Sequence, residues 1–102
     1  DDDISSVCGS FNFEIDKNKI KEVFIAFGGM AAVPKRAKAC EKILKNKPLN
    51  LSTFNQAKNY LDKDLSPIGD MRASKEYRLE IAKNLLMKCF VEIHSNKLTR
   101  VN

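Results

Sequence analysis

The chain is poor in the residues that build metal sites, disulfide frameworks and nucleophilic catalytic centres. It has three cysteines and one histidine among 102 residues. Cys8, Cys40 and Cys89 lie far apart, without a C-x-x-C or Cys/His spacing, which argues against a metal site or a closed disulfide framework. We expect three reduced, mostly buried thiols. We also expect His94 to occupy a surface or helix-end position without a catalytic partner.

Long apolar runs and a secretory leader are also missing. No apolar stretch approaches the roughly 20 residues that a membrane-spanning helix needs. The acidic start, Asp1 to Asp3, is the opposite of a signal peptide's positive region. Together with the reduced cysteines, these absences predict a cytoplasmic protein with no membrane partner. A mature chain rarely starts with three aspartates, so we also expect a fragment of a longer polypeptide.

Acidic residues are outnumbered by basic ones. The chain has 18 lysines and arginines against 13 aspartates and glutamates, a formal net charge of +5. A basic excess raises the question of nucleic-acid binding. The lysines are spread along the whole chain, however, and the aromatic–basic interleaving of single-strand binders is missing. We therefore interpret the charge as a solvated surface and expect no nucleic-acid partner.

The composition is that of an ordinary globular protein, with 43% hydrophobic and 30% charged residues. The length fits one domain over residues 1–102, in which residues 1–6 form an acidic linker and residues 95–102 a tail. A chain this short buries a modest core, so nearly every apolar stripe must be used.

Two segments near the start have the period of two that a half-buried strand requires. Val7–Ile15 has apolar residues at most odd positions, and Ile20–Phe27 has Val23, Ile25 and Phe27 on one face. The stretch between them, Asp16 to Lys19, supplies turn-forming residues. These features predict an antiparallel hairpin.

Three helices are predicted after the hairpin. Pro34 suits the first turn of an amphipathic helix over residues 35–45. A second helix, with Asn50 or Ser52 as its N-cap, covers residues up to 65, where a break follows. The third has Ser74 as its N-cap and continues to His94.

The third helix has the widest apolar face. Its apolar residues are Leu79, Ile81, Ala82, Leu85, Leu86, Cys89, Phe90 and Ile93. A face of about half the circumference predicts a central helix that is buried on more than one side. We expect Leu85 to be part of this buried face.

The order β-β-α-α-α predicts an α+β fold in which an antiparallel hairpin is covered on one face by three helices. Two strands make a marginal sheet, so we expect one more strand, lost from this chain or supplied in trans. It would most naturally precede Asp1 and pair with Val7–Ile15. Without it, the exposed edge of that strand would allow two copies of the fragment to form a homodimer.

The paired glycines, Gly28 and Gly29, leave two interpretations open. They could form a phosphate-binding turn, or a strand-to-helix turn in which small residues allow close packing. The run from Gly28 to Pro34 has no Lys, Ser or Thr, which favours the second interpretation. No general acid–base pair or nucleophile emerges elsewhere, so the residues alone indicate a small accessory or interaction domain.

Three stretches carry a resemblance to a known family: DDDISSVCGSFNF, AFGGMAAVPKRA and DMRASKEYRLEIAKNLL. They stand in the order, and at about the spacing, of the C-terminal part of the FAD-binding region of xanthine dehydrogenases. The chain resembles the bacterial small subunit from Asp2 to about Phe90, and the wider class includes the medium subunit of carbon monoxide dehydrogenase. The combination of GGMA, PKRA and RASKEYR is specific, whereas any one of them alone is not. The family fold, an α+β sandwich of three or four strands and three helices, agrees with the pattern above.

The resemblance implies an oxidoreductase that hydroxylates hypoxanthine and xanthine at a molybdenum cofactor. Electrons then pass through iron–sulfur clusters to FAD and on to NAD. The chain would be the C-terminal subdomain of the FAD module, packed against the preceding FAD-binding subdomain and in one complex with the molybdenum-binding subunit. The isolated fragment would be inactive and would not bind FAD.

The same resemblance implies a small set of cofactor-side residues. Matched along R-x-D-D-I, Asp2 and Asp3 are the acidic residues beside the flavin, with Asp2 nearest the ring, where a carboxylate would tune the reduction potential. A solvated chain end is the alternative for these aspartates. Val33 stands where the family often has Thr, so the cap of the first helix is in doubt. Arg72, Tyr77 and Arg78 could reach the flavin subdomain or another subunit, although packing at the helix start is favoured.

A different class of function stays open beside the enzyme. The chain could be a free-standing small basic module that binds nucleic acid or a protein. The coding sequence upstream of Asp1 distinguishes the two hypotheses, because flavin-binding segments should precede it only in the first.

Overall fold

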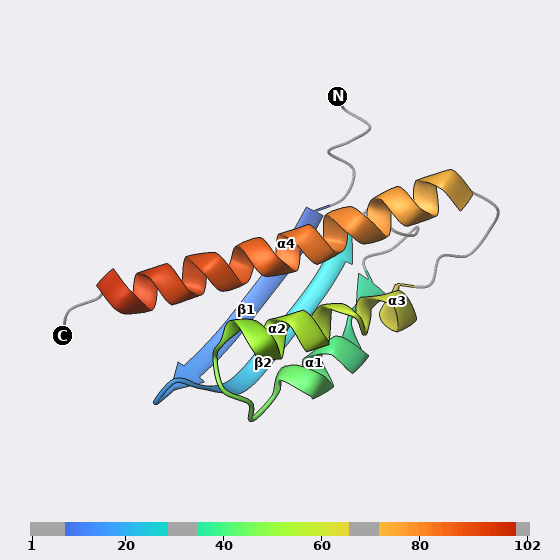
Figure 1. The fold of residues 1–102 in the computed structure, drawn as a ribbon. Helices are drawn as coiled ribbons and strands as arrows, with labels where there is room; N and C mark the ends of the chain where they lie inside the picture. The colour runs from blue at the N-terminus through green and yellow to red at the C-terminus, as the bar shows by residue number, and fades with distance from the viewer. Residues whose placement is uncertain (1–7, 29–34, 66–71, 100–102) are drawn as a thin grey trace.

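The computed structural model describes residues 8–28, 35–65 and 72–99, and side-chain packing within residues 9–28, 35–65 and 76–95. These residues form two layers, a three-stranded antiparallel sheet and a layer of helices on one side of it (Figure 1). The long C-terminal helix lies across the strands, and the shorter helices lie beside it. The predicted α+β class is therefore confirmed.

Strands β1 (Cys8–Asp16) and β2 (Lys19–Gly28) pair as the antiparallel hairpin that the sequence predicts. The two residues between them, Lys17 and Asn18, have φ values of 52° and 65°. Two left-handed residues form the tight connection whose twist suits a hairpin. Asn adopts this conformation readily, whereas Lys17 is held in it by the closure of the two strands.

A β-bulge in β2 explains a break in the apolar period. The register shifts between Glu14 and Ile15, so that Lys21 has no residue opposite it. As a result Ile20 and Val23, three positions apart, both face the helices and are buried. The side chain at Lys21 stays exposed.

Strand β3 (Lys35–Arg36) corrects the predicted start of the first helix. These two residues pair with β2 on the edge away from β1, which gives the sheet order β1-β2-β3. Ala37 continues the contact, because its N–H donates to the carbonyl of Ile25 at 2.8 Å. Helix α1 (Lys38–Leu44) begins only after that bond. A third strand thus comes from within the chain, and a strand before Asp1 would lie outside the described residues.

The second predicted helix is divided into two. Helix α2 (Leu51–Lys58) begins at Asn50, whose side chain accepts a hydrogen bond from the N–H of Thr53 at 2.8 Å. This confirms Asn50 among the two predicted caps. At Tyr60 the chain tightens to an i→i−3 bond with Ala57, and α3 (Leu61–Asp64) follows. The tighter turn directs Leu61 and Leu65 into the core, where both are buried.

Helix α4 (Arg72–Thr99) is longer than predicted at both ends. Ser74 lies inside the helix, not at its N-cap, and the predicted tail from residue 95 is helical as far as Thr99. Among the described side chains of α4, the buried positions form one line, Ala82, Leu86 and Phe90. Leu85 is only partly buried. The prediction of a helix buried on more than one side is therefore wrong, because α4 lies on the outside of the helical layer.

The core lies between the inner face of the sheet and the helices. Its buried apolar members among the described residues are Ile20, Val23, Ile25, Phe27, Ala37, Cys40, Leu44, Leu49, Phe54, Ala57, Leu61, Leu65, Ala82, Leu86 and Phe90. Phe54 connects the layers, since its ring centroid lies 5.7 Å from that of Phe13 in β1 and 4.8 Å from that of Phe90 in α4.

Candidate functional site

The residues that the resemblance assigns to the flavin lie outside the described part of the chain. This applies to Asp2 and Asp3, and also to the turn after Gly28 and to Val33. Tyr77 and Arg78 stand near the start of α4, where the Tyr77 side chain is half exposed. The structure therefore neither joins these residues into one site nor separates them.

A cluster that no sequence pattern predicts lies beside β2 and β3 and consists of Glu41, Arg36 and Phe24. Glu41 of α1 is buried, and its Oε2 accepts two hydrogen bonds, from the backbone N–H of Ile25 at 2.8 Å and from Nε of Arg36 at 2.9 Å. The carboxylate therefore occupies the place on β2 that a longer β3 would take. Glu41 also raises the pKa of the Arg36 guanidinium through this hydrogen bond and through its charge.

Arg36 is held from a second side by an aromatic ring. Its guanidinium carbon lies 4.7 Å from the ring centroid of Phe24, on the face of the sheet away from the helices. A guanidinium over an aromatic face is attracted by the ring quadrupole. Half of the Arg36 side chain is exposed, and so is more than a third of Phe24. The result is a fixed cation on an accessible surface.

A second carboxylate fixes the start of α1. Asp64, at the end of α3, accepts hydrogen bonds from the backbone N–H groups of Ala39 and Cys40, each at 2.8 Å. The N-cap residue of α1, Ala37, provides no side-chain bond of its own. Helix α1 is thus capped by Asp64 of α3 and not by a neighbouring residue in the sequence. A sequence pattern could not reveal it, because the partners are 24 and 25 residues apart.

The described cysteines are inert thiols. Burial, followed by the nearby charges of Asp64 and Glu41, raises the pKa of Cys40 to about 12. Burial also raises the pKa of Cys89 to about 11, with a further contribution from Glu92. Both are free, as predicted, whereas the side chain of Cys8 lies outside the described residues. Neither Cys40 nor Cys89 is a thiolate nucleophile near neutral pH.

Histidine and possible metal ligands add no catalytic centre to the described residues. His94 is exposed and stacks on Phe90 with a centroid distance of 5.5 Å, which agrees with the predicted surface position. The described parts of the chain hold no group of three or more His, Cys, Asp or Glu side chains arranged for a metal ion. No helix within them is long and apolar enough to cross a membrane.

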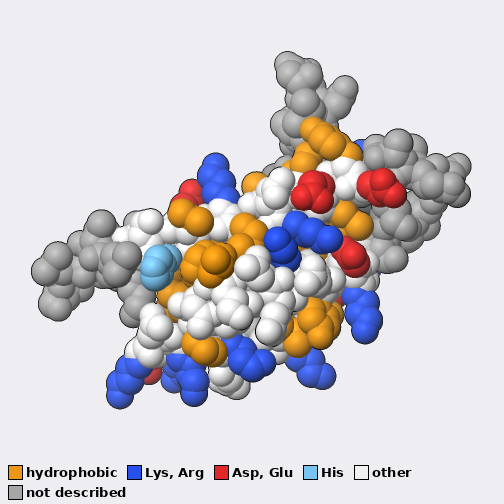
Figure 2. All heavy atoms as spheres, viewed as in Figure 1, with side chains coloured by type: hydrophobic (Ala, Val, Ile, Leu, Met, Phe, Trp, Pro, Cys, Tyr) orange, Lys and Arg blue, Asp and Glu red, His pale blue; other side chains and the backbone are white. Residues whose placement is uncertain are grey.

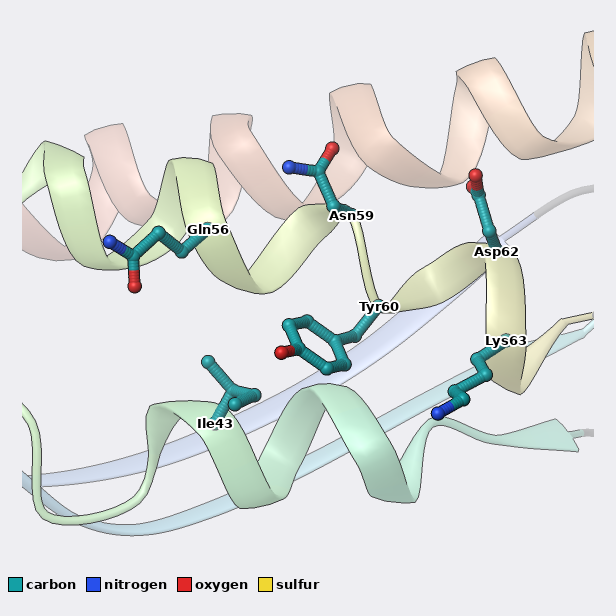
Figure 3. A pocket seen from close by; sticks show the side chains of 6 residues that line it. All are labelled: Ile43, Gln56, Asn59, Tyr60, Asp62 and Lys63. Atoms are coloured by element: carbon teal, nitrogen blue, oxygen red, sulfur yellow. The ribbon is translucent and has the colours of Figure 1, made fainter.

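A shallow groove lies between α1 and the α2–α3 segment (Figure 3). Tyr60 lies between the two walls, with Ile43 on one side and the amides of Gln56 and Asn59 on the other. Asp62 and Lys63 complete the lining, and Asp62 is paired with Lys83 of α4 at 2.9 Å. The groove offers two amides, a phenol and one charge of each sign, and none of the residues assigned to the flavin lines it.

Charge is unevenly distributed over the helical face. Figure 2 shows lysine and arginine side chains along the border that carries the β1–β2 turn and α1, whereas acidic side chains lie near α3 and α4. Lys17, Lys19 and Lys21 surround a small hollow at that turn together with Asp16 and Asn46. The basic excess is thus exposed at the surface.

Comparison with known proteins places these features in a family. The profile of the CO dehydrogenase flavoprotein C-terminal domain matches residues 1–93. The xanthine dehydrogenase FAD-binding subunit of Escherichia coli O157:H7 is 32% identical over 90 residues, which cover 88% of this chain and 31% of that protein. The glyceraldehyde dehydrogenase medium chain of Sulfolobus acidocaldarius is 34% identical over 76 residues, or 74% of this chain and 27% of that one. The chain thus spans about a third of the length of these curated relatives.

A solved structure shares the fold. Quinoline 2-oxidoreductase from Pseudomonas putida 86 superposes with a TM-score of 0.70 at 21% identity, over 84% of this chain and 30% of that one. At this identity the match supports the two-layer architecture and no more.

Proposed function

The chain belongs to the CO dehydrogenase flavoprotein C-terminal domain family, and we propose that it is the C-terminal subdomain of the FAD module of a molybdenum-dependent xanthine dehydrogenase. The observation that carries this proposal is the family match over residues 1–93. The xanthine dehydrogenase FAD-binding subunit matches 88% of this chain, against 74% for the glyceraldehyde dehydrogenase medium chain, and this wider match supports the choice of enzyme within the family. The subdomain packs against the FAD-binding subdomain and supports electron transfer without contributing a catalytic group.

The rest of the enzyme follows from the same proposal. Hypoxanthine or xanthine is hydroxylated at the molybdenum cofactor of a separate subunit, and electrons pass through iron–sulfur clusters to FAD and then to NAD. The chain covers 31% of its relative, so these centres belong to other parts of the complex. The complex is cytoplasmic.

Asp2 and Asp3 are the residues of this chain that act toward the flavin. FAD, when bound, supplies the group that accepts and releases electrons. The assignment of Asp2 and Asp3 to the flavin rests on the family resemblance, in which they match the acidic residues of R-x-D-D-I. The carboxylates of Glu41 and Asp64 bind backbone N–H groups inside the domain instead. A negative charge beside the ring opposes the addition of further negative charge, and so lowers the reduction potential.

The proposal is tested in the assembled flavoprotein by changing these aspartates. Asp2→Asn and Asp3→Asn are expected to raise the reduction potential of FAD, with the larger change at Asp2, as measured by spectroelectrochemical titration. Glu14→Gln is the matched control, since it removes an exposed carboxylate from β1. Equal potentials in all four proteins would refute the role of the aspartates. A flavoprotein that contains this chain but oxidises neither purine would refute the assignment to xanthine dehydrogenase.

The 102-residue chain alone is expected not to bind FAD. Titration of FAD fluorescence with the chain should show no saturable quenching, because the proposal assigns most flavin contacts to the preceding subdomain. Saturable quenching at low micromolar FAD would show that this chain holds the cofactor itself. Tight, salt-dependent binding of a nucleic-acid duplex would instead favour the rival basic module.

A further inference from the structure

The sheet has one face that no described element covers. The helices lie on the other side (Figure 1), and the outward side chains of β1 at Ser10, Asn12 and Glu14 are exposed. The strand register places Phe24 opposite Asn12, and places Ala26 between Ser10 and Arg36. The middle of this open face therefore carries the aromatic ring of Phe24 and the guanidinium of Arg36, and the residues beside them in the register are small.

Phe24 and Arg36 are fixed before any partner arrives. Phe24 is anchored in the central strand, and Arg36 is held 4.7 Å above its ring and 2.9 Å from Glu41. Ordering two long side chains usually costs free energy on association, and here the fold has already ordered them. Aromatic residues and arginine are also the types that dominate binding energy at protein interfaces.

Arg36 selects a partner that carries a carboxylate. Glu41 accepts from Nε, which leaves the two terminal nitrogens of the exposed half of the side chain available for a planar acceptor. A carboxylate meets such a fork with two parallel hydrogen bonds. Lys35, the neighbour of Arg36 in β3, is exposed as well and adds a second positive charge.

We propose that this open face, centred on Phe24 and Arg36, is the surface that docks on the FAD-binding part of the same flavoprotein, with a carboxylate of that part paired to Arg36. This inference rests on the proposed function. The chain matches only 31% of its relative, so a flavoprotein of this kind has a large remainder for the domain to contact. The exposed apolar groups Leu51 and Val91 belong to helices α2 and α4, which lie on the other side of the sheet.

Hydroxyl-radical footprinting read by mass spectrometry tests the docking surface. Oxidation of Phe24 is compared between the dilute 102-residue chain and the assembled flavoprotein, with Leu51 and Val91 as internal references. We expect oxidation of Phe24 to fall by about fivefold or more on assembly, because a ring at the centre of an interface is desolvated. Oxidation of Leu51 and Val91 should hardly change. Unchanged oxidation of Phe24, or protection of Leu51 and Val91 alone, would overturn the proposal.

Two variants keep the test independent of folding. Phe24→Ser should lower the thermal midpoint of the flavoprotein clearly more than that of the 102-residue chain, which loses only the contacts of Phe24 within the domain. Leu51→Ser should shift the two midpoints by similar, small amounts. A flavoprotein that retains FAD and purine oxidation but leaves Phe24 unprotected would refute the docking surface while the proposed function stands. A protein without FAD would refute the proposed function. Protection of Phe24 in the chain alone on concentration would identify a second copy as the occupant and overturn the proposal.

Discussion

At the scale of single residues, one buried carboxylate substitutes for a missing piece of strand. Glu41 accepts from the N–H of Ile25 at a point where β3 has already ended. We predict that Glu41→Ala lowers the free energy of unfolding by about 1–3 kcal/mol, because it leaves that buried N–H without an acceptor. Urea denaturation measures the loss.

Glu22→Ala is the matched control for Glu41→Ala. Glu22 is also a glutamate with a basic neighbour, but 63% of its side chain is exposed and its contact with Lys45 is 3.5 Å long. Such a pair contributes about 0–1 kcal/mol. Losses of the same size in the two variants would contradict the role of Glu41 at the strand edge.

The Cys40 thiol makes stability depend on pH above the neutral range. Its pKa is about 12 in the fold against an ordinary value of 9.0. The unfolded chain therefore releases this proton first as the pH rises. The contribution of Cys40 to stability is complete below pH 9 and is lost as the pH rises from 9 toward 12.

We predict a shallower loss of stability with alkali when this thiol is removed. Urea midpoints of the wild-type chain and of Cys40→Ala are measured across pH 8 to 10. The difference between the two midpoints should shrink as the pH rises, because only the wild type loses the thiol contribution. Parallel pH profiles would contradict the buried, protonated thiol. Cys89→Ala is the comparison, since the pKa of that half-buried thiol is raised only to about 11.

At the scale of elements, the helices are short and depend on one another. Helix α1 has seven residues, fewer than an isolated helix needs in water. It receives its N-terminal cap from Asp64. We predict that Asp64→Ala costs about 1–2 kcal/mol, the usual value of a lost cap, and that hydrogen exchange of the Ala39 and Cys40 amides accelerates.

The neighbouring Asp62 provides the control for Asp64. Asp62 lies two residues earlier in α3 and pairs with Lys83, but its side chain is 60% exposed. Asp62→Ala should cost about 0–1 kcal/mol and leave exchange in α1 unchanged. Faster exchange in α1 after the loss of Asp62 would mean that α3 supports α1 in some other way.

Two adjacent leucines in α4 separate its inner face from its flank. Leu86 is fully buried and Leu85 only partly. We predict a loss of about 2–5 kcal/mol for Leu86→Ala and a clearly smaller loss for Leu85→Ala, measured from thermal or urea midpoints. An equal or larger effect at Leu85 would show that α4 is rotated from the described position.

The sequence predicted the elements whose signals are local. The alternation in β1 and β2 and the cap at Asn50 are written in neighbouring residues, and the structure confirms them. Strand β3 was missed because two charged residues carry no apolar period, and its pairing is decided by β2. The wide apolar face of α4 led to a prediction of too much burial. The residues on the flanks of that face are apolar, like core residues, but they are only partly buried.

The candidate site was predicted less well than the fold. The flavin-side aspartates came from a family resemblance, and they lie outside the described residues. The Arg36–Glu41–Phe24 cluster escaped notice because its members come from three elements, and a single sequence does not show which of its many charges become neighbours.

At the scale of the whole molecule, the two outer edges of the sheet differ. The edge of β2 that faces away from β1 is closed by β3, by Glu41, and by the hydrogen bonds of Ile20 with Asn46 and Lys47. Among the described elements, only β2 pairs with β1. A strand of nine residues with an unpaired edge is a template for another chain.

We therefore predict that the 102-residue chain self-associates through β1. Sedimentation should show a dimer for this chain and a monomer for a version extended at its N-terminus by about fifteen residues, on the order of one strand and its lead-in. The added strand would occupy the edge and so prevent pairing of two copies. Monomers of both versions at high micromolar concentration would contradict the prediction.

The cap that Asp64 provides to α1 also sets a sequence of events during synthesis. A ribosome makes Ala39 and Cys40 before it reaches the residue whose carboxylate holds their N–H groups, 24 to 25 positions later. A nascent chain that ends before Asp64 thus carries the segment of α1 without the bonds that start the helix. The strand pairing of β1 with β2 is local, whereas the bonds that start α1 need a residue made later. The helical layer can therefore be completed only when α3 has left the ribosome.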